Sequence, residues 1–442
     1  MNGVSVNKMR RLLEDEGGNF GIMTALLLPV LFLAGSVAVN VTSAVKESSK
    51  MQAALDTAAI TAVKSFGEGE SESDARTAAN ALFFANFERS SHLEADNLSD
   101  PDEGATIQVE FSVIDDEPTA TASYKADYDP LFWGLRPYRI SRESVAARAQ
   151  GKEACILALH PTATRAFEVG GSATVDTSNC TITSNSKDVQ SIYIGGTATL
   201  KAECLYATGK VSATLANTKL ACGKAREDVP PTPDPFKRKA MPTAGSLVNL
   251  AGCGQNFVGN GGGNGDCNGT GKTPSKVPDD YSVTLKPGTY RGLEVKGKVR
   301  LEAGNYIIDG GALKFTSQSI ISGDGVTFFL LNGAQIDIHG GANFHVTAAT
   351  SGPWAGFVIV AARNNTQAAV INGNSASSLT GIIYMPASTE IKYAGSGTTG
   401  GECVRIVAQE ITMIGNSAFK SDCKKELADA KINNPGAIRL VR

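Results

Sequence analysis

The stretch FEVGGSATVDTSNCTI (residues 167–182) is repeated, with changes, as IYIGGTATLKAECLY (residues 192–206). The Gly170–Gly171 pair of the first copy recurs 25 residues later as Gly195–Gly196. Strand-like runs that return at a fixed period with glycine turns are typical of stacked β-coils, in which each repeat contributes one rung. Two similar hairpins, produced by chance or by a local duplication, are the alternative interpretation.

The same pattern returns more regularly after residue 281. LEVKGKVRL begins at Leu293, LKFTSQSII at Leu313 and IDIHGGANF at Ile336, so the spacings are 20 and 23 residues. Later strand-like runs are GFVIVAA (from Gly356), LTGIIYM (from Leu379) and CVRIVAQEITMIG (from Cys403). A β-sandwich also has short strands and turns. The near-constant spacing instead predicts a right-handed parallel β-helix, or a less regular β-solenoid, over residues 155–423, closed by a short capping helix at Asp422–Ile432.

A proline- and glycine-rich insert at residues 224–275 interrupts this pattern. Residues 224–245 hold five prolines and several charges, which predicts a linker or a long loop between coils. Residues 252–271 hold nine glycines, too few side chains for a packed core, so we expect a loop closed by a disulfide between Cys253 and Cys267.

Near the N-terminus, residues 17–45 contain no charged side chain, and their centre reads FGIMTALLLPVLFLAGSVAV. About 20 apolar residues in a helix cross a bilayer, so this run predicts a transmembrane anchor. Lys8, Arg10 and Arg11 precede it, and the positive-inside rule keeps that end in the cytoplasm and exports the rest. A cleaved signal peptide is the alternative, but it would have a shorter apolar stretch and a better cleavage site than Ala34-Gly35-Ser36.

The residues that follow the anchor predict a small α+β unit. Apolar side chains fall at helical spacing over residues 46–66 and again over residues 71–87, which predicts an αα-hairpin. Residues 105–114 and 119–126 alternate at period two, as paired strands do, and residues 144–149 add a third strand.

Overall composition excludes several classes of protein. The formal net charge is −3 and no basic stripe is present, so we expect no nucleic-acid partner. The chain holds 47 glycines and only 7% aromatic residues, which favours many turns and short strands over helical bundles.

All eight cysteines follow the anchor, which indicates disulfides in an oxidising compartment. One scheme pairs sequence neighbours, and a rival scheme joins Cys180 to Cys204, which occupy equivalent places in the repeat. The neighbour scheme gives Cys155–Cys180, Cys204–Cys222, Cys253–Cys267 and Cys403–Cys423. No Cys-x-x-Cys pair occurs, so a zinc ribbon is not expected.

Catalytic candidates are few. An enzyme built on stacked coils needs paired carboxylates, a calcium cluster or a basic side chain on one face. Asp337 and His339 are two residues apart and share a face in a strand, which makes them weak candidates for a glycan site. The other candidates are Asp309, Asp324 and His345, and both aspartates lie in glycine turns. The loop GNGGGNGDCNG departs from a calcium repeat, and we expect no catalytic residue, metal or cofactor.

Residues 16–65 resemble the N-terminal module of the TadG-like Flp pilus-assembly proteins. The resemblance rests on Gly18-Asn19-Phe20, on Pro29 inside the apolar helix, and on the run from Met51 to Ala59 (MQAALDTAA). The stretch YDPLFWGLRPYRISRESVAARA (residues 128–149) is similar to the end of that module. One departure is Asn40, where the family usually has Asp.

This resemblance covers only about the first 150 residues. It implies a bacterial inner-membrane protein with a pilin-like module, linked to export of a tight-adherence pilus. We therefore expect three parts: a cytoplasmic start and anchor (1–45), a pilin-like α+β module (46–150) and a disulfide-stapled β-helix (151–442).

The expected function is structural or assembly-related and non-enzymatic, with the inner membrane and pilus-assembly proteins as partners. One alternative is a surface protein that binds or cleaves polysaccharide through the β-helix. Another is an adhesin whose processed body is released, with a mature N-terminus near Ser36 or beyond.

Overall fold

The chain forms two compact units in a computed structural model. One unit contains residues 1–149 and 438–442, and the other contains residues 150–437. The structure describes residues 18–67, 70–87, 93–95, 106–114, 117–131, 136–213, 217–248, 275–277, 282–372, 377–394, 398–399, 403–423, 427 and 430–441. The C-terminal residues therefore group with the N-terminal unit and not with the unit that precedes them.

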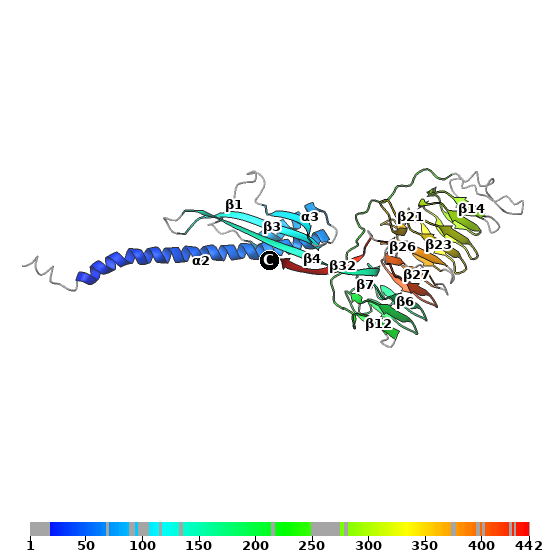
Figure 1. Cartoon of the computed structure of the whole chain (residues 1–442), viewed down its shortest axis with the longest axis horizontal. Coiled ribbons are helices and arrows are strands. Elements are labelled where there is room, and N and C mark those ends of the chain that lie inside the picture. Colours follow the sequence, from blue (N-terminus) through cyan, green and yellow to red (C-terminus); the bar gives the residue numbers. More distant parts are fainter. Residues whose placement is uncertain are drawn as a thin grey trace, which may run out of the picture. The chain divides into compact units, whose positions relative to one another are not determined.

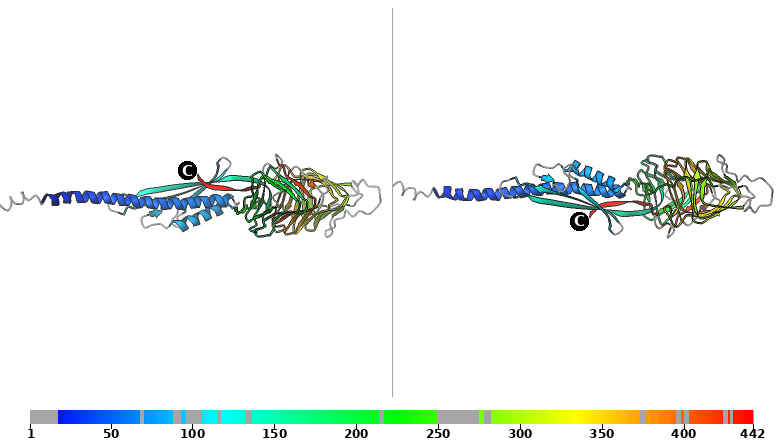
Figure 2. Two further views of the ribbon diagram at one scale, coloured as in Figure 1. Left: turned by 90° about the horizontal axis from the view of Figure 1, so that it is seen from below. Right: turned by 90° about the horizontal axis from the view of Figure 1, so that it is seen from above.

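Two helices in the first unit form the expected αα-hairpin. Helix α2 (Gly18–Gly67) is one continuous rod, and α3 (Glu72–Asn86) lies against it (Figures 1 and 2). Helix α3 begins at Ser71, whose Oγ accepts a hydrogen bond from the Asp74 amide at 3.0 Å and so caps the first turn. The fully buried side chains of α2 are Met51, Leu55, Ala58, Ala59, Ala62 and Val63. The helical spacing over residues 46–66 predicts this buried face, although Phe66 at its end is only half-buried.

The first unit also contains an antiparallel sheet. Strand β2 (Gln108–Ile114) pairs with β3 (Glu117–Tyr128), and β3 pairs with β4 (Tyr138–Ala158) and with the short β1 (Leu93–Ala95). These pairings confirm the predicted strands, although β4 begins earlier and ends later than expected. Alternate residues of β3 are buried against the helices, including Ala120, Ala122 and Tyr124.

The second unit is a stack of short parallel strands. Its ten-stranded sheet contains, in spatial order, β11 (Val211–Ala213), β8 (Ile192–Ile194), β5 (Phe167–Val169), β30 (Ile411–Met413), β27 (Ile391–Tyr393), β25 (Ala369–Ile371), β22 (Gln335–Ile338), β19 (Ala312–Phe315), β16 (Leu293–Val295) and β13 (Ser275–Val277). A five-stranded sheet contains β12 (Thr218–Leu220), β9 (Thr199–Ala202), β6 (Thr174–Thr177), β31 (Ala418–Lys420) and β28 (Thr398–Thr399).

Two further parallel ladders complete the stack, and they share one long strand. The first contains β14 (Ser282–Leu285), β17 (Lys298–Leu301), β20 (Ile320–Gly323), β23 (Asn343–Thr347) and β26 (Ser378–Met385). The second contains β15 (Gly288–Tyr290), β18 (Gly304–Asp309), β21 (Val326–Leu331), β24 (Phe357–Ala361), β26, β29 (Val404–Ala408), β4, β7 (Thr181–Ser184) and β10 (Leu205–Ala207). The last strand of the chain is β32 (Asn433–Val441).

Register within these ladders confirms the repeat that the sequence shows. Val175 lies opposite Leu200, and Leu293 lies opposite Leu313, which in turn lies opposite Ile336. All five side chains are buried, so each rung adds an apolar layer to one core.

The repeated glycine pair has a steric reason. Gly171 and Gly196 both have positive φ, at 66° and 70°. A Cβ on Gly196 would lie 2.7 Å from the carbonyl oxygen of Gly171 on the neighbouring rung. Only glycine combines this left-handed turn with such close stacking.

Strand order in space differs from strand order along the chain. The last rung pairs directly with the first, because β29 lies beside β4, β30 beside β5 and β31 beside β6. The chain therefore enters the stack at an internal rung and winds outward to β10, β11 and β12. It then crosses to the far end, where a bridge between Leu247 and Thr289 begins the second set of coils (Figure 1).

The crossing segment is packed against a sheet over its described residues. Phe236 makes edge contacts with Phe357 and Tyr384, at ring-centroid distances of 4.8 and 5.5 Å. The Tyr384 hydroxyl donates to Asp234 at 2.7 Å, and Arg363 donates to the Phe236 carbonyl at 2.6 Å. The predicted linker is therefore a fixed strap over at least residues 234–241, while the glycine-rich loop falls in residues 249–274, outside the described part of the chain.

Asn434 of β32 joins the end of the chain to strand β7 of this stack. Its Oδ1 accepts hydrogen bonds from the hydroxyls of Thr183 (2.6 Å) and Thr232 (3.2 Å), and its Nδ2 donates to Thr181 (2.7 Å). All four residues are buried. The network therefore holds β32, the crossing segment at Thr232 and β7 together.

The expected capping helix at Asp422–Ile432 is not seen in the described residues of that segment, which are 422, 423, 427 and 430–432. Leu427, Ala430 and Ile432 instead pack with Phe357 and Tyr384 on a sheet face. They follow the rung that pairs with β4–β6, so this segment does not lie at an end of the stack. A cap is needed only where a rung has no neighbour.

We predict that Asn434→Ala lowers the stability of the second unit by about 2–4 kcal/mol, because it removes three hydrogen bonds between buried groups. Asn433→Ala, at the exposed neighbouring residue, is the matched control and should change stability by less than about 0.5 kcal/mol. Urea unfolding of both variants tests this, and equal midpoints would contradict the role assigned to the network.

Candidate membrane anchor and other sites

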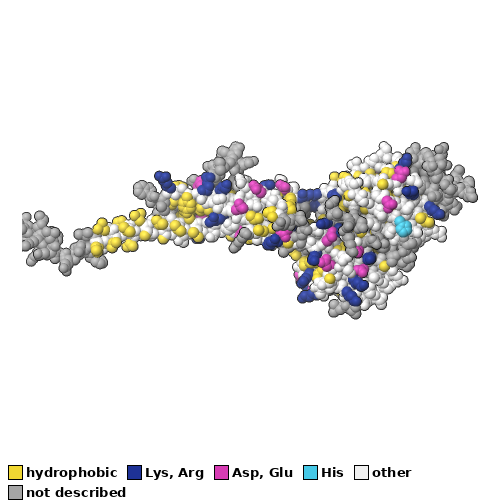
Figure 3. All heavy atoms as spheres, viewed as in Figure 1, with side chains coloured by type: hydrophobic (Ala, Val, Ile, Leu, Met, Phe, Trp, Pro, Cys, Tyr) yellow, Lys and Arg dark blue, Asp and Glu magenta, His cyan; other side chains and the backbone are white. Residues whose placement is uncertain are grey.

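The N-terminal half of α2 exposes large apolar side chains along its length. Leu26, Leu31 and Phe32 are 70, 68 and 71% exposed. The helix has one candidate membrane span, found from Met23 onward, with a mean hydropathy of 2.1 in its most apolar window, of which only 6% is buried. Figure 3 shows this continuous apolar surface. Removing each such side chain from water is worth about 1.5–3 kcal/mol, so length and composition both fit a bilayer.

Pro29 lies within the exposed half of the helix, and α2 continues through it without a break (Figure 1). Proline removes one backbone donor, which is costly in a soluble helix. Spanning helices tolerate proline, so this residue fits the same assignment.

Asn40 marks the point where α2 begins to contact the rest of its unit. It is the first buried polar residue of the described helix, at 4% exposure, and its Oδ1 accepts a hydrogen bond from the Leu131 amide at 2.8 Å. Ala44, Glu47 and Met51 follow it on the buried side. The neutral amide of Asn40 therefore holds Leu131, just after β3, against the helix.

The run MQAALDTAA has a structural role further along the same helix. Asp56 accepts hydrogen bonds from Gln52 (2.9 Å) and from the Ser144 hydroxyl (2.7 Å), and Gln52 also donates to the Glu143 carbonyl (3.1 Å). Leu55 between them is fully buried. These contacts fix β4 alongside α2.

Three disulfides lie in the described part of the second unit: Cys155–Cys180, Cys204–Cys222 and Cys403–Cys423. This is the pairing of sequence neighbours, and the rival bond between Cys180 and Cys204 does not form because each is bonded elsewhere. Cys253 and Cys267 lie outside the described residues.

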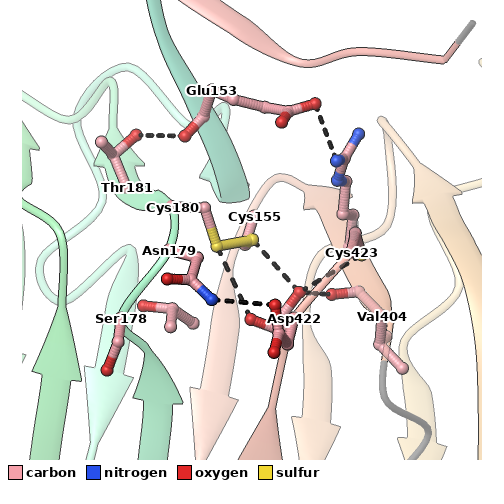
Figure 4. The surroundings of a disulfide bond; sticks show 12 residues. Glu153, Cys155, Ser178, Asn179, Cys180, Thr181, Val404, Asp422 and Cys423 are labelled. Atoms are coloured by element: carbon pink, nitrogen blue, oxygen red, sulfur yellow. Dashed lines mark hydrogen bonds and ion pairs between the residues drawn. A yellow bond between two sulfur atoms is a disulfide. The ribbon is translucent and has the colours of Figure 1, made fainter. Parts of the chain in front are cut away.

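Two of these bonds meet where the last rung packs on the first. The Ser421 hydroxyl lies 3.1 Å from the sulfur of Cys155 and 3.7 Å from that of Cys423, and it donates to the Val404 carbonyl at 2.6 Å. Figure 4 shows Cys423 and Val404 beside the Cys155–Cys180 bond. Each bond closes a loop of about 20 residues, worth roughly 3 kcal/mol.

An ion pair between a buried arginine and a partly exposed glutamate lies at the same junction, and the sequence did not predict it. Arg405, which is 3% exposed, approaches Glu153 at 2.7 Å and donates to the Ala430 carbonyl at 3.0 Å. Burial lowers the pKa of Arg405, and the carboxylate of Glu153 opposes that shift. No sequence signal links residues 153 and 405, because their pairing depends on the order of rungs in space.

A second group that the sequence did not predict consists of Glu410, Glu390 and His160. Partial burial raises the pKa of Glu410, as does the charge of Glu390, whereas His160 lowers it. Glu390 and Glu410 precede paired strands, and the Glu410 carbonyl accepts from Ile391 at 2.8 Å. His160 accepts two backbone hydrogen bonds at Nδ1, from Thr162 and Ala163.

The predicted glycan-site candidates form a small surface pair. His339 Nε2 lies 3.2 Å from Asp337 Oδ2, and both side chains are about 40% exposed. Asp337 lies opposite Lys314 and Val370 in the ladder, so neither adjacent rung supplies a second carboxylate at this position.

The remaining candidates lie apart from this pair and have local partners. Asp309 accepts from Asn332, Asp324 accepts from Thr347, and His345 contacts Ser378.

Comparison with known families identifies the N-terminal helix. Residues 18–65 match the family model described as Flp pilus-assembly TadE/G-like. The match covers α2 almost to its end, including Pro29, Asn40 and the Gln52–Asp56 contacts. No curated protein and no solved structure matches the chain.

We predict that Glu410→Gln stabilises the second unit at neutral pH but not at acidic pH. A carboxyl whose pKa is raised by folding costs stability above that pKa, and the cost disappears once pH falls below the unfolded value. Thermal unfolding from pH 4 to 8 should show a smaller loss of stability with rising pH in the variant. Glu390→Gln removes only the neighbouring charge and should give part of the effect; identical pH profiles for all three proteins would contradict the assignment.

Proposed function

We propose that this chain is a membrane-anchored, exported structural or assembly component of a Flp/Tad (tight adherence) pilus system, without enzymatic activity. One observation carries the proposal. The family match falls on a helix whose first half is apolar and exposed and whose second half forms the core of the first unit. Such a helix is both a membrane span and the backbone of a folded module.

The proposed topology places the N-terminus in the cytoplasm and the rest of the chain in the periplasm or beyond. Lys8, Arg10 and Arg11 support it through the positive-inside rule. Three disulfides in the second unit also support it, because such bonds persist in oxidising compartments. The expected partners are the inner membrane and other pilus-assembly proteins.

We further propose that the second unit is a right-handed parallel β-helix that serves as a rigid exported body. Successive coils add parallel strands to the same ladders, as in β14–β16 followed by β17–β19. Parallel crossovers are right-handed in nearly all proteins, which favours that hand here.

The anchor is tested by alkaline carbonate extraction of membranes that contain the full chain. We predict that the protein stays with the membrane, and that Leu31→Arg releases a large share of it, because arginine at the centre of a span costs about 2.5–3.5 kcal/mol. Val113→Arg is the matched control, since Val113 is 65% exposed but lies outside α2. Release of the unmodified protein, with a mature N-terminus near Ser36, would instead indicate a cleaved signal or a processed adhesin.

The alternative is a surface protein that binds or cleaves polysaccharide, and the Asp337–His339 contact is the observation in its favour. We predict that Asp337→Ala with His339→Ala leaves the stability and the membrane location unchanged. Loss of a glycan-binding or glycan-cleaving activity in this folded double variant would favour the alternative. A glycan array that compares the two proteins measures this.

A further inference from the structure

The first unit has two ends at different distances from the apolar span. At one end, the Leu131 amide bonds to Asn40 of α2. At the other end, Phe66 of α2 lies 4.7 Å from Phe111 of β2 (ring centroids). With a rise of 1.5 Å per helical residue, the two contacts are about 39 Å apart along α2.

The Leu131 end lies at the level where the span must finish. A hydrocarbon core of about 30 Å takes about 20 helical residues, so a span that begins near Phe20 ends near Asn40. Leu131, which bonds to Asn40, is therefore at the lipid–water boundary when α2 crosses the bilayer. This step rests on the proposed membrane anchor.

The described surface at this end has the composition of a membrane interface. Leu131 and Tyr138 are 42 and 47% exposed, and the Tyr138 ring packs 5.5 Å from that of Tyr128. Arg136 and Arg139 flank Tyr138 and are exposed. Aromatic rings and basic side chains are the groups that settle at the headgroup level of a bilayer.

The distal end of the same sheet is also apolar, but it lies about 39 Å further along α2 from the span. Val113 and Ile114 are 65 and 55% exposed there. Charges of both signs lie at this end too, since Arg439 pairs with Glu117 at 2.7 Å. Apolar exposure is thus similar at both ends, but only the end beside Asn40 lies at the level of the headgroups, where Arg136 and Arg139 can reach anionic phospholipids.

We propose that the β3–β4 end of the first unit docks on the bilayer surface, with Leu131 and Tyr138 in the interface and Arg136 and Arg139 against the phosphates of anionic lipids. The first unit then contacts the membrane at a second place beside α2. Arg139 also pairs with Asp127 at 3.1 Å, and such exposed pairs contribute at most about 1 kcal/mol, so a phosphate competes readily for it.

The test uses the full chain in phosphatidylcholine vesicles, with and without phosphatidylglycerol. A photoreactive benzoylphenylalanine replaces Tyr138, or Leu131 in a second variant, and Val113 in the matched control. We expect lipid adducts, measured by mass spectrometry, to be several-fold more abundant at positions 138 and 131 than at 113. Phosphatidylglycerol should increase them, and Arg136→Gln with Arg139→Gln should remove that increase.

Vesicle flotation in the same samples separates this inference from the anchor. If the variants float but positions 138 and 131 yield no more lipid adducts than position 113, the docking surface is refuted and the anchor stands. Adducts at 138 only to a second protein chain would also refute it. If no variant floats, the anchor proposal itself fails, and the docking proposal fails with it.

Discussion

One half of helix α2 is suited to lipid and the other half packs inside a folded unit in water. The structure of the first unit depends on this difference. From Met23 to Val39 its large apolar side chains have no protein cover, whereas from Ala44 onward one side is buried against α3 and the sheet. A helix pairs nearly all of its interior backbone groups within itself, so it can pass from lipid to water with few of them unpaired. The transition falls at Asn40, a small neutral amide that is buried and still satisfies a backbone donor of the neighbouring loop.

The family match covers both parts of this helix. Residues 18–65 include both the exposed span and the contacts of Gln52 and Asp56 with β4. The span and the buried face of the first unit thus lie on one continuous helix. An insertion between them would rotate the buried face relative to the span by about 100° for each added residue. The helix therefore fixes the position of the first unit relative to the candidate membrane span.

In the second unit the corresponding constraint is the junction of the last rung with the first. Strands β29, β30 and β31 pair with β4, β5 and β6, and two disulfides, Ser421 and the Arg405–Glu153 pair lie at that junction. A ladder of parallel strands propagates order only through its neighbours. The two sets of coils, which are far apart in sequence, become one stack because strand pairing, the Ser421 contact with Cys155 and the Arg405–Glu153 pair close this junction.

The sequence by itself determined the local structure and the register. Helical spacing located the buried face of α2, and the 25-residue repeat placed Val175 opposite Leu200, because both patterns depend on neighbouring residues along one chain. Only the tertiary structure decided that the chain enters the stack at an internal rung, that residues 234–241 form a strap, and that Arg405 pairs with Glu153. The spacing of the repeats does not determine the order in which the rungs stack in space. That order is set by contacts between distant segments, above all the pairing of β30 with β5 and the hydrogen bonds of Asn434 with Thr181 and Thr183.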